Sequence, residues 1–256
     1  MIPAPAVAAS SPELLAAASA VAAALGLPLA SGEATGLQLR CTPAGLELYD
    51  PGERCAVRCD LVGGAAGYRQ RHAGGDQALA RAVGVRGGRR PGVVDATAGL
   101  GRDGCLLAAL GCRVTLLERS AVIHALLRDG LQRALATPAF AAQVGDRLQL
   151  LHADAADWLA AHPVGSAAAV VYLDPMHPPR RSSALVRKEM RLLRAAVGAD
   201  ADAARLLPLA LAAAAERVVV KRPAGAEPLA GVAPDWVIGG RTTRFDVYRA
   251  LPASAR

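Results

Sequence analysis

The sequence predicts an α/β protein, with helices on both faces of a mostly parallel sheet and a small α+β region in front of it. Two observations predict this class. From residue 69 onward, short apolar segments alternate with helical ones, as in a parallel sheet joined by crossover helices. The apolar run Val170–Leu173 shows no polar alternation, which is typical of a strand buried on both faces. The 256 residues suffice for one full domain and a small appendage.

The first 68 residues have a different pattern from the rest of the chain. Ser11-Pro12-Glu13 is a helix start, with an N-cap serine, a proline at the first helical position and an acid in the first turn. That helix is expected to end at Gly26. Alternating residues in 37–40 and 46–48 flank a turn at 42–45, which predicts a hairpin. We therefore expect a helix and hairpin region over residues 1–68, with a third strand around 55–62, and a main domain over residues 69–256.

Strands and helices are expected to alternate through the main domain. The predicted strands are 93–94, 114–117, 148–151, 170–173 and 217–220, with a closing hairpin of 235–238 and 245–248. The predicted helices are 76–83, 104–110, 121–135, 155–159, 183–197 and 206–215.

Composition narrows the class of function. The net charge of +7 favours contact with polyanions such as nucleic acids, although a solubility surplus explains it equally well. The five cysteines form no CxxC pair, so we expect no metal site, and their odd number suits a reducing compartment. The N-terminus lacks a basic leader segment, and no apolar run reaches membrane length. We therefore expect a cytoplasmic protein without a membrane or metal partner.

A glycine-rich turn follows the first strand of the main domain. The strand enters Asp95, and the turn that contains Gly99 and Gly101 leads into a helix that begins near Arg102 and Asp103. Ligands of doubly wound folds lie at the carboxyl ends of the strands. Glycines let the backbone approach such a ligand, and a helix N-terminus offers free N–H groups to an anion. The turn therefore predicts a cofactor pocket, although some glycine turns serve only tight packing.

Two further strand ends carry acids. Glu118, followed by Arg119, ends the next strand about twenty residues after the turn, where a carboxylate accepts hydrogen bonds from a ribose. That spacing fits both NAD and S-adenosylmethionine. After the strand 148–151 comes a segment with Asp154 and Ala155, whose position suits a contact to the edge of an adenine.

The step Asp174-Pro175 distinguishes between these cofactors. It ends a central strand and resembles the Asp/Asn-Pro-Pro-aromatic motif of methyltransferases that act on exocyclic base amines. Such an amine is a poor nucleophile, because its lone pair is delocalised into the ring. The Asp174 carboxylate and the Pro175 carbonyl could accept both amine hydrogens and direct the lone pair at a sulfonium methyl group. His177 stands in the aromatic slot and could stack on the base or form a hydrogen bond.

Basic residues gather downstream of this step. Arg187, Arg191 and Arg194 fall on one face of the predicted helix 183–197, opposite an apolar stripe that includes Met190 and Leu193. That basic face could hold a nucleic-acid backbone or simply be solvated. The residues we expect to bind substrate are His177, Arg180, Arg181, Arg187, Lys188, Arg191 and Lys221.

Taken together, these residues resemble the ribosomal small-subunit RNA guanine-N2 methyltransferase J family. The likeness covers about residues 37 to 250. The matching stretches are Asp95–Asp103, Leu117–Arg119, Tyr172–Met176, Ser183–Val186 with Lys188–Met190, and Val218–Pro223.

The resemblance implies a Rossmann-like class I methyltransferase sheet and S-adenosylmethionine as the methyl donor. The implied acceptor is the N2 amine of one guanine in 16S ribosomal RNA, either free or in the assembled small subunit. Asp174 and Pro175 are the expected catalytic residues. The expected cofactor-binding residues are Asp95, Gly99, Gly101, Arg102, Asp103, Glu118, Arg119, Asp154, Ala155 and Asp174.

Three alternatives remain open from the sequence. An NAD-dependent oxidoreductase explains the glycine turn and Glu118 but leaves Asp174-Pro175 without a role. A non-catalytic RNA-binding protein on the same fold explains the charge but leaves the acids at Asp95, Glu118 and Asp174 unexplained. A methyltransferase that acts on another RNA or on a protein amide fits the same motifs.

Overall fold

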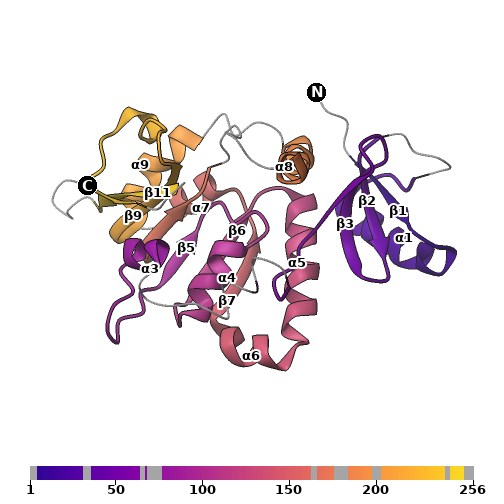
Figure 1. Ribbon diagram of the computed structural model, residues 1–256, viewed down its shortest axis with the longest axis horizontal. Coiled ribbons are helices and arrows are strands. Elements are labelled where there is room, and N and C mark those ends of the chain that lie inside the picture. The colour runs from indigo at the N-terminus through magenta and orange to yellow at the C-terminus, as the bar shows by residue number, and fades with distance from the viewer. Residues whose placement is uncertain are drawn as a thin grey trace.

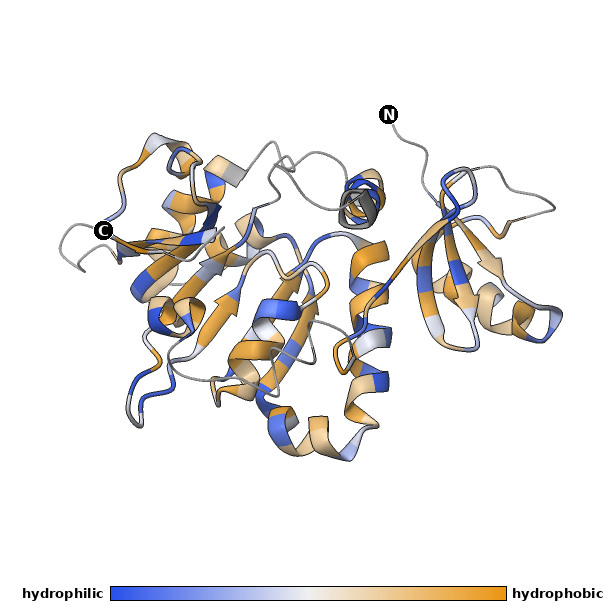
Figure 2. Ribbon diagram, in the orientation of Figure 1, coloured by the Kyte–Doolittle hydropathy of each residue, from blue (hydrophilic) through white to orange (hydrophobic). Residues whose placement is uncertain are grey.

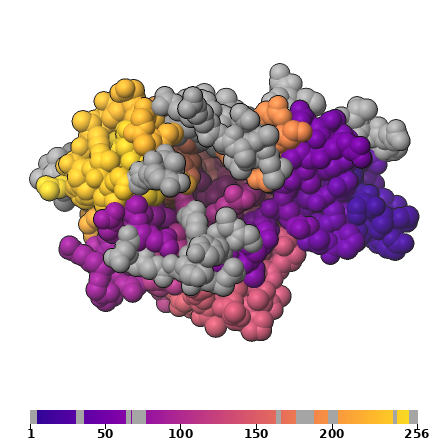
Figure 3. All heavy atoms as spheres, in the orientation of Figure 1, coloured from indigo at the N-terminus to yellow at the C-terminus, as the bar shows by residue number. Residues whose placement is uncertain are grey.

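The computed structural model describes residues 5–30, 36–63, 67, 77–162, 166–175, 184–197, 203–239 and 243–250, without the side chains of 184–187, 197 and 203. Its strands form two sheets (Figure 1), one of four strands and one of seven. The small sheet lies at one end of the molecule and the carboxyl-terminal hairpin lies toward the other (Figure 3).

The small sheet has the order β1-β2-β3-β4. Its strands are β1 (Ala6–Ala9), β2 (Gln38–Thr42), β3 (Gly45–Asp50) and β4 (Cys55–Arg58), and helix α1 (Leu15–Leu25) packs beside them. The predicted helix end is confirmed, since Gly26 caps α1 with φ 63°. The predicted hairpin is confirmed as the antiparallel pair β2–β3.

Strand β1 was not predicted, because alanine-rich Ala6–Ala9 has little intrinsic strand preference. It forms through tertiary contacts. It pairs in parallel with β2, and Val7 N donates to Pro28 O at 2.8 Å while Ala30 N donates to Val7 O at 2.7 Å. Strand β1 therefore closes the free edge of β2.

The large sheet has the order β10-β11-β9-β8-β5-β6-β7. Strands β5 to β9 run parallel, and β10 and β11 form the predicted closing hairpin, with β11 antiparallel to β9. The predicted α/β class is therefore confirmed. The bounds of the strands are β5 (Val93–Asp95), β6 (Val114–Glu118), β7 (Leu148–His152), β8 (Ala168–Leu173), β9 (Ala214–Pro223), β10 (Trp236–Gly239) and β11 (Thr243–Arg249).

The helices of the main domain cover both faces of this sheet (Figure 1). Helix α6 was not predicted, because seven residues are too few to give a clear helical period. The bounds of the helices are α3 (Ala78–Val83), α4 (Arg102–Ala109), α5 (Ala121–Leu135), α6 (Pro138–Val144), α7 (Ala155–Ala161), α8 (Ala184–Val197) and α9 (Ala203–Ala213).

The central strands β5 and β8 of the large sheet are buried on both faces, as the apolar runs predict. In β5, Val93 belongs to one core cluster and Val94 to the other, because successive strand residues point to opposite faces. In β8, Val170 and Val171 divide in the same way. Figure 2 shows these central strands as mostly hydrophobic. This two-sided burial fixes the position of the carboxyl ends of the strands, where the acids lie.

Helix α5 joins the small sheet to the main domain. The Asp129 carboxylate accepts a hydrogen bond from Leu46 N at 3.1 Å. The Arg133 guanidinium donates to Cys59 O at 2.7 Å. Leu48 of the small sheet and Leu126 of α5 belong to one hydrophobic cluster. The division at residue 68 stays a prediction, and residues 68–76 lie outside the described residues.

Gly130 of α5 is expected to be essential for this packing. A Cβ atom at this position would lie 2.5 Å from Cys59 Sγ and 2.8 Å from Cys59 O. Overpacking of this kind costs about 1–3 kcal/mol, which exceeds the helix preference of alanine over glycine, about 1 kcal/mol. We expect Gly130→Ala to lower the free energy of unfolding by about 1–2 kcal/mol in urea denaturation. Gly239→Ala is the matched control, because a Cβ there meets no atom within 4 Å. Unchanged stability in Gly130→Ala would contradict this packing role.

Candidate active site

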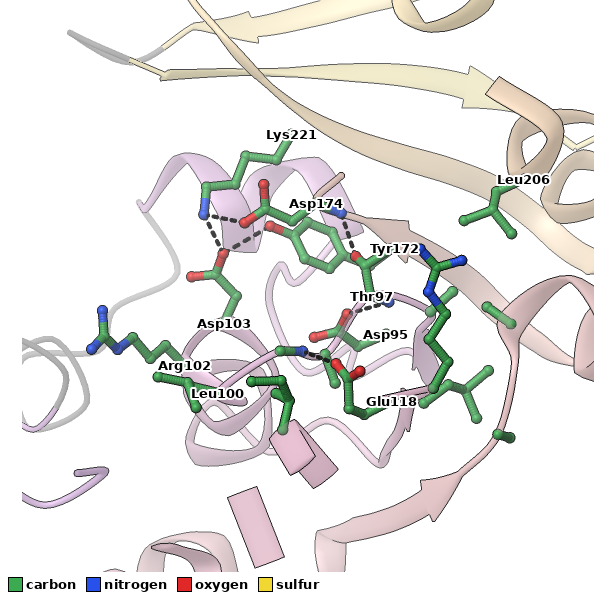
Figure 4. A pocket seen from close by; sticks show the side chains of 18 of the residues that line it. Asp95, Thr97, Leu100, Arg102, Asp103, Glu118, Tyr172, Asp174, Leu206 and Lys221 are labelled. Atoms are coloured by element: carbon green, nitrogen blue, oxygen red, sulfur yellow. Dashed lines mark hydrogen bonds and ion pairs between the residues drawn. The ribbon is translucent and has the colours of Figure 1, made fainter. Parts of the chain in front are cut away.

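A cavity of about 340 Å³ opens at the carboxyl ends of the parallel strands. It lies where the strand order reverses, because β5 has β6 on one side and β8 on the other. Such switch points are where doubly wound sheets bind ligands. Figure 4 shows its acids converging from several strands. The lining residues are Asp95–Leu100, Arg102, Asp103, Leu117–Arg119, Ile123, Ala153–Ala155, Tyr172, Asp174, Met190, Leu193, Leu206 and Lys221.

The glycine turn forms the floor of the cavity. Gly99 lines it with φ 54°, a left-handed conformation that favours glycine. Gly101 also has positive φ but is absent from the cavity wall formed by the described residues. A Cβ at Gly101 would lie 2.6 Å from Leu127 Cδ1. Backbone conformation and packing against α5 therefore both require a glycine at 101, and its contact with the cofactor stays a prediction.

Glu118 ends β6 and ties two loops together. Its carboxylate accepts hydrogen bonds from Gly99 N at 3.0 Å and from Ser120 N at 2.7 Å. The residue is buried, with an exposed fraction of 7%. Backbone N–H groups thus orient this carboxylate at the cavity wall before any ligand arrives.

Asp154 begins helix α7. One of its oxygens accepts hydrogen bonds from Ala156 N at 2.8 Å and from Asp157 N at 3.3 Å, as an N-cap does. Its other oxygen lies 4.0 Å from the Arg119 guanidinium. Ala155 is buried and lines the cavity beside it. Asp154 and Ala155, which are expected near an adenine, therefore share one wall with Arg119.

Asp174 follows directly after β8 and lies at the centre of the cavity (Figure 4). Its backbone N donates to Thr97 Oγ1 at 2.6 Å. This bond joins the end of β8 to the glycine turn. Pro175 is buried and is not among the described residues that line the cavity.

A cluster of charged groups surrounds the Asp174 carboxylate. Lys221 Nζ lies 2.7 Å from Asp174 Oδ2 and 2.7 Å from Asp103 Oδ2. The Tyr172 hydroxyl donates to the same Asp103 oxygen at 2.8 Å. Burial lowers the pKa of Lys221, but the two carboxylates outweigh it and raise that pKa above its ordinary value. Burial and the neighbouring Asp103 raise the pKa of Tyr172, so its hydroxyl remains a donor.

Asp95 lies deeper than the other acids. Its exposed fraction is 2%, and its carboxylate accepts a hydrogen bond from Thr97 N at 3.2 Å. Burial, with the nearby Asp103 and Asp174 charges, raises the pKa of Asp95 to about 8. The surroundings of Asp95 therefore disfavour a negative charge at this position, and a cationic ligand nearby would favour it.

Helix α8 forms part of the cavity wall and is tied to the small sheet. Met190 and Leu193, from the predicted apolar stripe, line the cavity. On the basic side, Lys188 Nζ lies 3.0 Å and the Arg191 guanidinium 3.3 Å from the Glu53 carboxylate, in the turn between β3 and β4. The side chains of Lys188 and Arg191 remain 40% and 59% exposed. The basic face is thus partly neutralised within the chain while staying accessible.

Several expected residues cannot be placed. His177, Arg180 and Arg181 lie outside the described residues, as does the side chain of Arg187. In contrast, sequence reasoning assigned no role to Thr97, Tyr172 or Leu206, which line the cavity. For Tyr172, a polar group inside an otherwise apolar strand was an available signal, since a buried hydroxyl needs a partner.

In the described part of the chain, no group of three or more histidine, cysteine or acidic side chains could hold a metal ion. No helix within the described ranges is long and apolar enough to span a bilayer.

Known proteins with similar sequences and structures are methyltransferases. Residues 21–250 match the family model described as "Putative SAM-dependent methyltransferase". The ribosomal RNA small subunit methyltransferase J of Thioalkalivibrio sulfidiphilus is 54% identical over 236 residues, which cover 90% of this chain and 92% of that protein. The protein of the same name from Pseudomonas paraeruginosa is 49% identical, covering 88% of this chain and 86% of that one. The crystal structure of a SAM-dependent methyltransferase from Neisseria gonorrhoeae has a TM-score of 0.74 and 33% identity, covering 96% of each chain.

These matches agree with the geometry of the site. The sheet is the Rossmann-like class I methyltransferase sheet that the sequence predicts. The methyl donor is S-adenosylmethionine, so the glycine turn and Glu118 are not evidence for an NAD enzyme. The likeness spans nearly the whole chain, from the small sheet to the closing hairpin. The chain belongs to the ribosomal RNA small subunit methyltransferase J family of SAM-dependent methyltransferases.

Proposed function

We propose that this enzyme transfers the methyl group of S-adenosylmethionine to the exocyclic N2 amine of a guanine in small-subunit ribosomal RNA. The observation that carries the proposal is the position of Asp174. The residue follows a central strand and lines the cavity, its carboxylate contacts the Lys221 ammonium, and its backbone N donates to the Thr97 hydroxyl. The names of the similar proteins, ribosomal RNA small subunit methyltransferases, support the class of acceptor.

The charges of the cavity suit the donor. S-adenosylmethionine carries a sulfonium and an ammonium, and the wall offers the carboxylates of Asp103, Glu118 and Asp174. Glu118 would accept from the ribose hydroxyls, and the wall at Asp154 and Ala155 would hold the adenine. The methionine end would lie near the helix start at Arg102 and Asp103, with Arg119, Asp95 and Gly99 completing the pocket. The cavity volume of about 340 Å³ is in the range of small-molecule sites.

Methyl transfer at this site would be a direct displacement. The Asp174 carboxylate and the Pro175 carbonyl would each accept a hydrogen bond from the guanine N2 amine, which has two N–H groups. The nitrogen lone pair would then attack the methyl carbon, a nitrogen–carbon bond would form, and the sulfur–carbon bond would break with its electron pair staying on sulfur. The methylated nitrogen, now positively charged, would then lose one proton to solvent water. The chain contributes orientation and electrostatic stabilisation.

The RNA would approach over helix α8 and the residues that precede it in the sequence. Lys188 and Arg191 expose their charged groups beside the cavity wall, and Arg180, Arg181 and Arg187 remain predicted contacts, with His177 as the predicted base contact. Arginine and lysine at such positions contact phosphates and fix the register of the RNA. We further propose that the assembled subunit is a substrate and that the reaction takes place in the cytoplasm.

An incorporation assay tests the class of acceptor. Purified enzyme is given S-adenosylmethionine with a tritiated methyl group and one of three acceptors, small subunits that lack the modification, naked 16S RNA, or ribosomal protein alone. Label in the RNA of either of the first two supports the proposal. Label in the protein fraction alone would replace the RNA acceptor with a protein amide.

Charge reversal on α8 tests the docking surface. We expect Arg191→Glu to weaken RNA binding and to leave the affinity for S-adenosylmethionine unchanged. The slope of log Kd against the logarithm of the salt concentration should fall by about one, the value for one lost phosphate contact. The change also breaks the pair with Glu53, so Glu53→Gln is the matched control. It breaks the pairs of Lys188 and Arg191 without removing a positive charge from α8. Filter binding at several salt concentrations checks both variants. Equal weakening in both would mean that the ion pairs, rather than the charge of α8, determine RNA affinity.

A further inference from the structure

Lys221 lies inside the acidic cluster rather than on the outer surface (Figure 4). It stands near the end of β9, next to β8, and Val220 before it is the register partner of Leu173. Its ammonium reaches Asp174 Oδ2 and Asp103 Oδ2, each at 2.7 Å. One cation therefore connects the end of β8 to the start of α4.

Each element around Lys221 contributes a titratable group. Strand β5 contributes Asp95, helix α4 contributes Asp103, and β8 contributes Tyr172 and Asp174. The side chain of Lys221 is 27% exposed, and that of Asp103 is 10% exposed. Carboxylates held this close in a partly buried site repel one another and tend to take up a proton. The Lys221 ammonium is in direct contact with two of them, so it opposes that protonation at Asp174.

We propose that Lys221 is a positioning residue for methyl transfer, whose ammonium holds the Asp174 carboxylate ionised and correctly oriented toward the acceptor amine. The inference rests on the proposed function and gives Lys221 a role other than the substrate contact expected from the sequence. A phosphate bound by this ammonium would have to compete with two carboxylates that are already in contact with it. The effect of Lys221 is therefore exerted through Asp174.

The same contacts predict which kinetic constant depends on Lys221. Without the ammonium, the Asp174 carboxylate loses the contact that orients it and takes up a proton at higher pH. Either change weakens its hydrogen bond to the acceptor amine, so the chemical step slows. Asp103 keeps its hydrogen bond from Tyr172 without Lys221, so the helix start retains one of its ties to β8. We therefore expect kcat to fall much more than the affinity for S-adenosylmethionine.

The first test compares Lys221→Met with Lys221→Arg. Methionine has a similar length but no charge, and arginine keeps the charge. We expect kcat of Lys221→Met to fall at least 10-fold at pH 7, with a Kd for S-adenosylmethionine within about 3-fold of wild type by calorimetry. The acidic limb of its kcat–pH profile should move to higher pH. Lys221→Arg should recover part of kcat and bring the limb back.

Controls separate this role from simple packing. Arg113→Met removes an exposed cation just before β6, at the amino ends of the parallel strands and so away from the cavity. This variant should leave kcat and the pH profile unchanged. Thermal denaturation of all variants shows whether each is folded. A Lys221→Met enzyme with wild-type kcat and pH profile would overturn the proposal, as would a loss confined to S-adenosylmethionine affinity.

A second test does not depend on turnover. Carbon-13 NMR of the chain labelled at aspartate carboxyls reports the titration of Asp174, with its signal assigned from Asp174→Asn. We expect the Asp174 midpoint to rise by about one pH unit or more in Lys221→Met. An unchanged midpoint would overturn the proposal even if turnover fell. A wild-type enzyme that methylates no RNA, with the expected shift of the midpoint, would instead count against the proposed acceptor.

Discussion

Replacing Asp174 with alanine is expected to lower kcat by about 100- to 1,000-fold, the loss seen when one polar group that stabilises a transition state is removed. The carboxylate is the group proposed to accept a hydrogen of the acceptor amine, and alanine has no acceptor. Its backbone N, which donates to Thr97 Oγ1, is retained by alanine, so the end of β8 should keep its place. Single-turnover methylation of small subunits measures this loss.

Two variants make the Asp174 result specific. Asp174→Asn keeps one acceptor oxygen and should retain more activity than alanine. Asp146→Ala removes an exposed carboxylate just before β7, at the amino ends of the parallel strands and so away from the cavity. This variant should be fully active. Wild-type turnover in Asp174→Ala, with S-adenosylmethionine bound normally, would end the proposed role of Asp174.

Replacing Glu118 with alanine is expected to raise the Kd for S-adenosylmethionine by about 10- to 100-fold, the value of one or two hydrogen bonds to a charged group. The carboxylate would contact the ribose, and it also holds Gly99 N and Ser120 N. Loss of this carboxylate therefore has two effects: it removes a contact to the ligand, and it removes a hydrogen bond that holds the glycine turn. Isothermal titration calorimetry measures the Kd directly.

Glu118→Gln separates these two effects. Glutamine keeps one acceptor oxygen for the loop but loses the charge, so an intermediate Kd is expected. Equal affinity in wild type and Glu118→Ala would show that the ribose does not bind at this residue. Equal loss in alanine and glutamine variants would assign the whole effect to the charge.

Much of this architecture follows from local sequence signals. Apolar runs such as Val170–Leu173 predicted strands buried on two faces, and Gly26 predicted a helix end, because each signal depends on neighbouring residues only. The edge that holds the site was predictable too, since the acids Asp95, Glu118 and Asp174 each end a strand. Strand β1 was missed because its stability comes from residues distant in the sequence, at β2 and at Pro28.

The internal connections of the site were not predictable. The contact of Lys221 with Asp103 and Asp174 joins residues 118 and 47 positions apart, and no spacing rule relates them. The pairing of Glu53 with Lys188 and Arg191 depends on how the small sheet packs against α8. The packing of Gly101 against Leu127 was not predictable either, because a glycine needed for packing and a glycine needed for a ligand contact look the same in the sequence.

The most direct test of the proposed function is nucleoside analysis of the methylated product. Small subunits that lack the endogenous modification are incubated with enzyme and tritiated S-adenosylmethionine, and their 16S RNA is digested to nucleosides and separated. The account predicts label in N2-methylguanosine, with none when the Asp174→Ala enzyme is used. Label in any other nucleoside, or equal labelling by both enzymes, would contradict it.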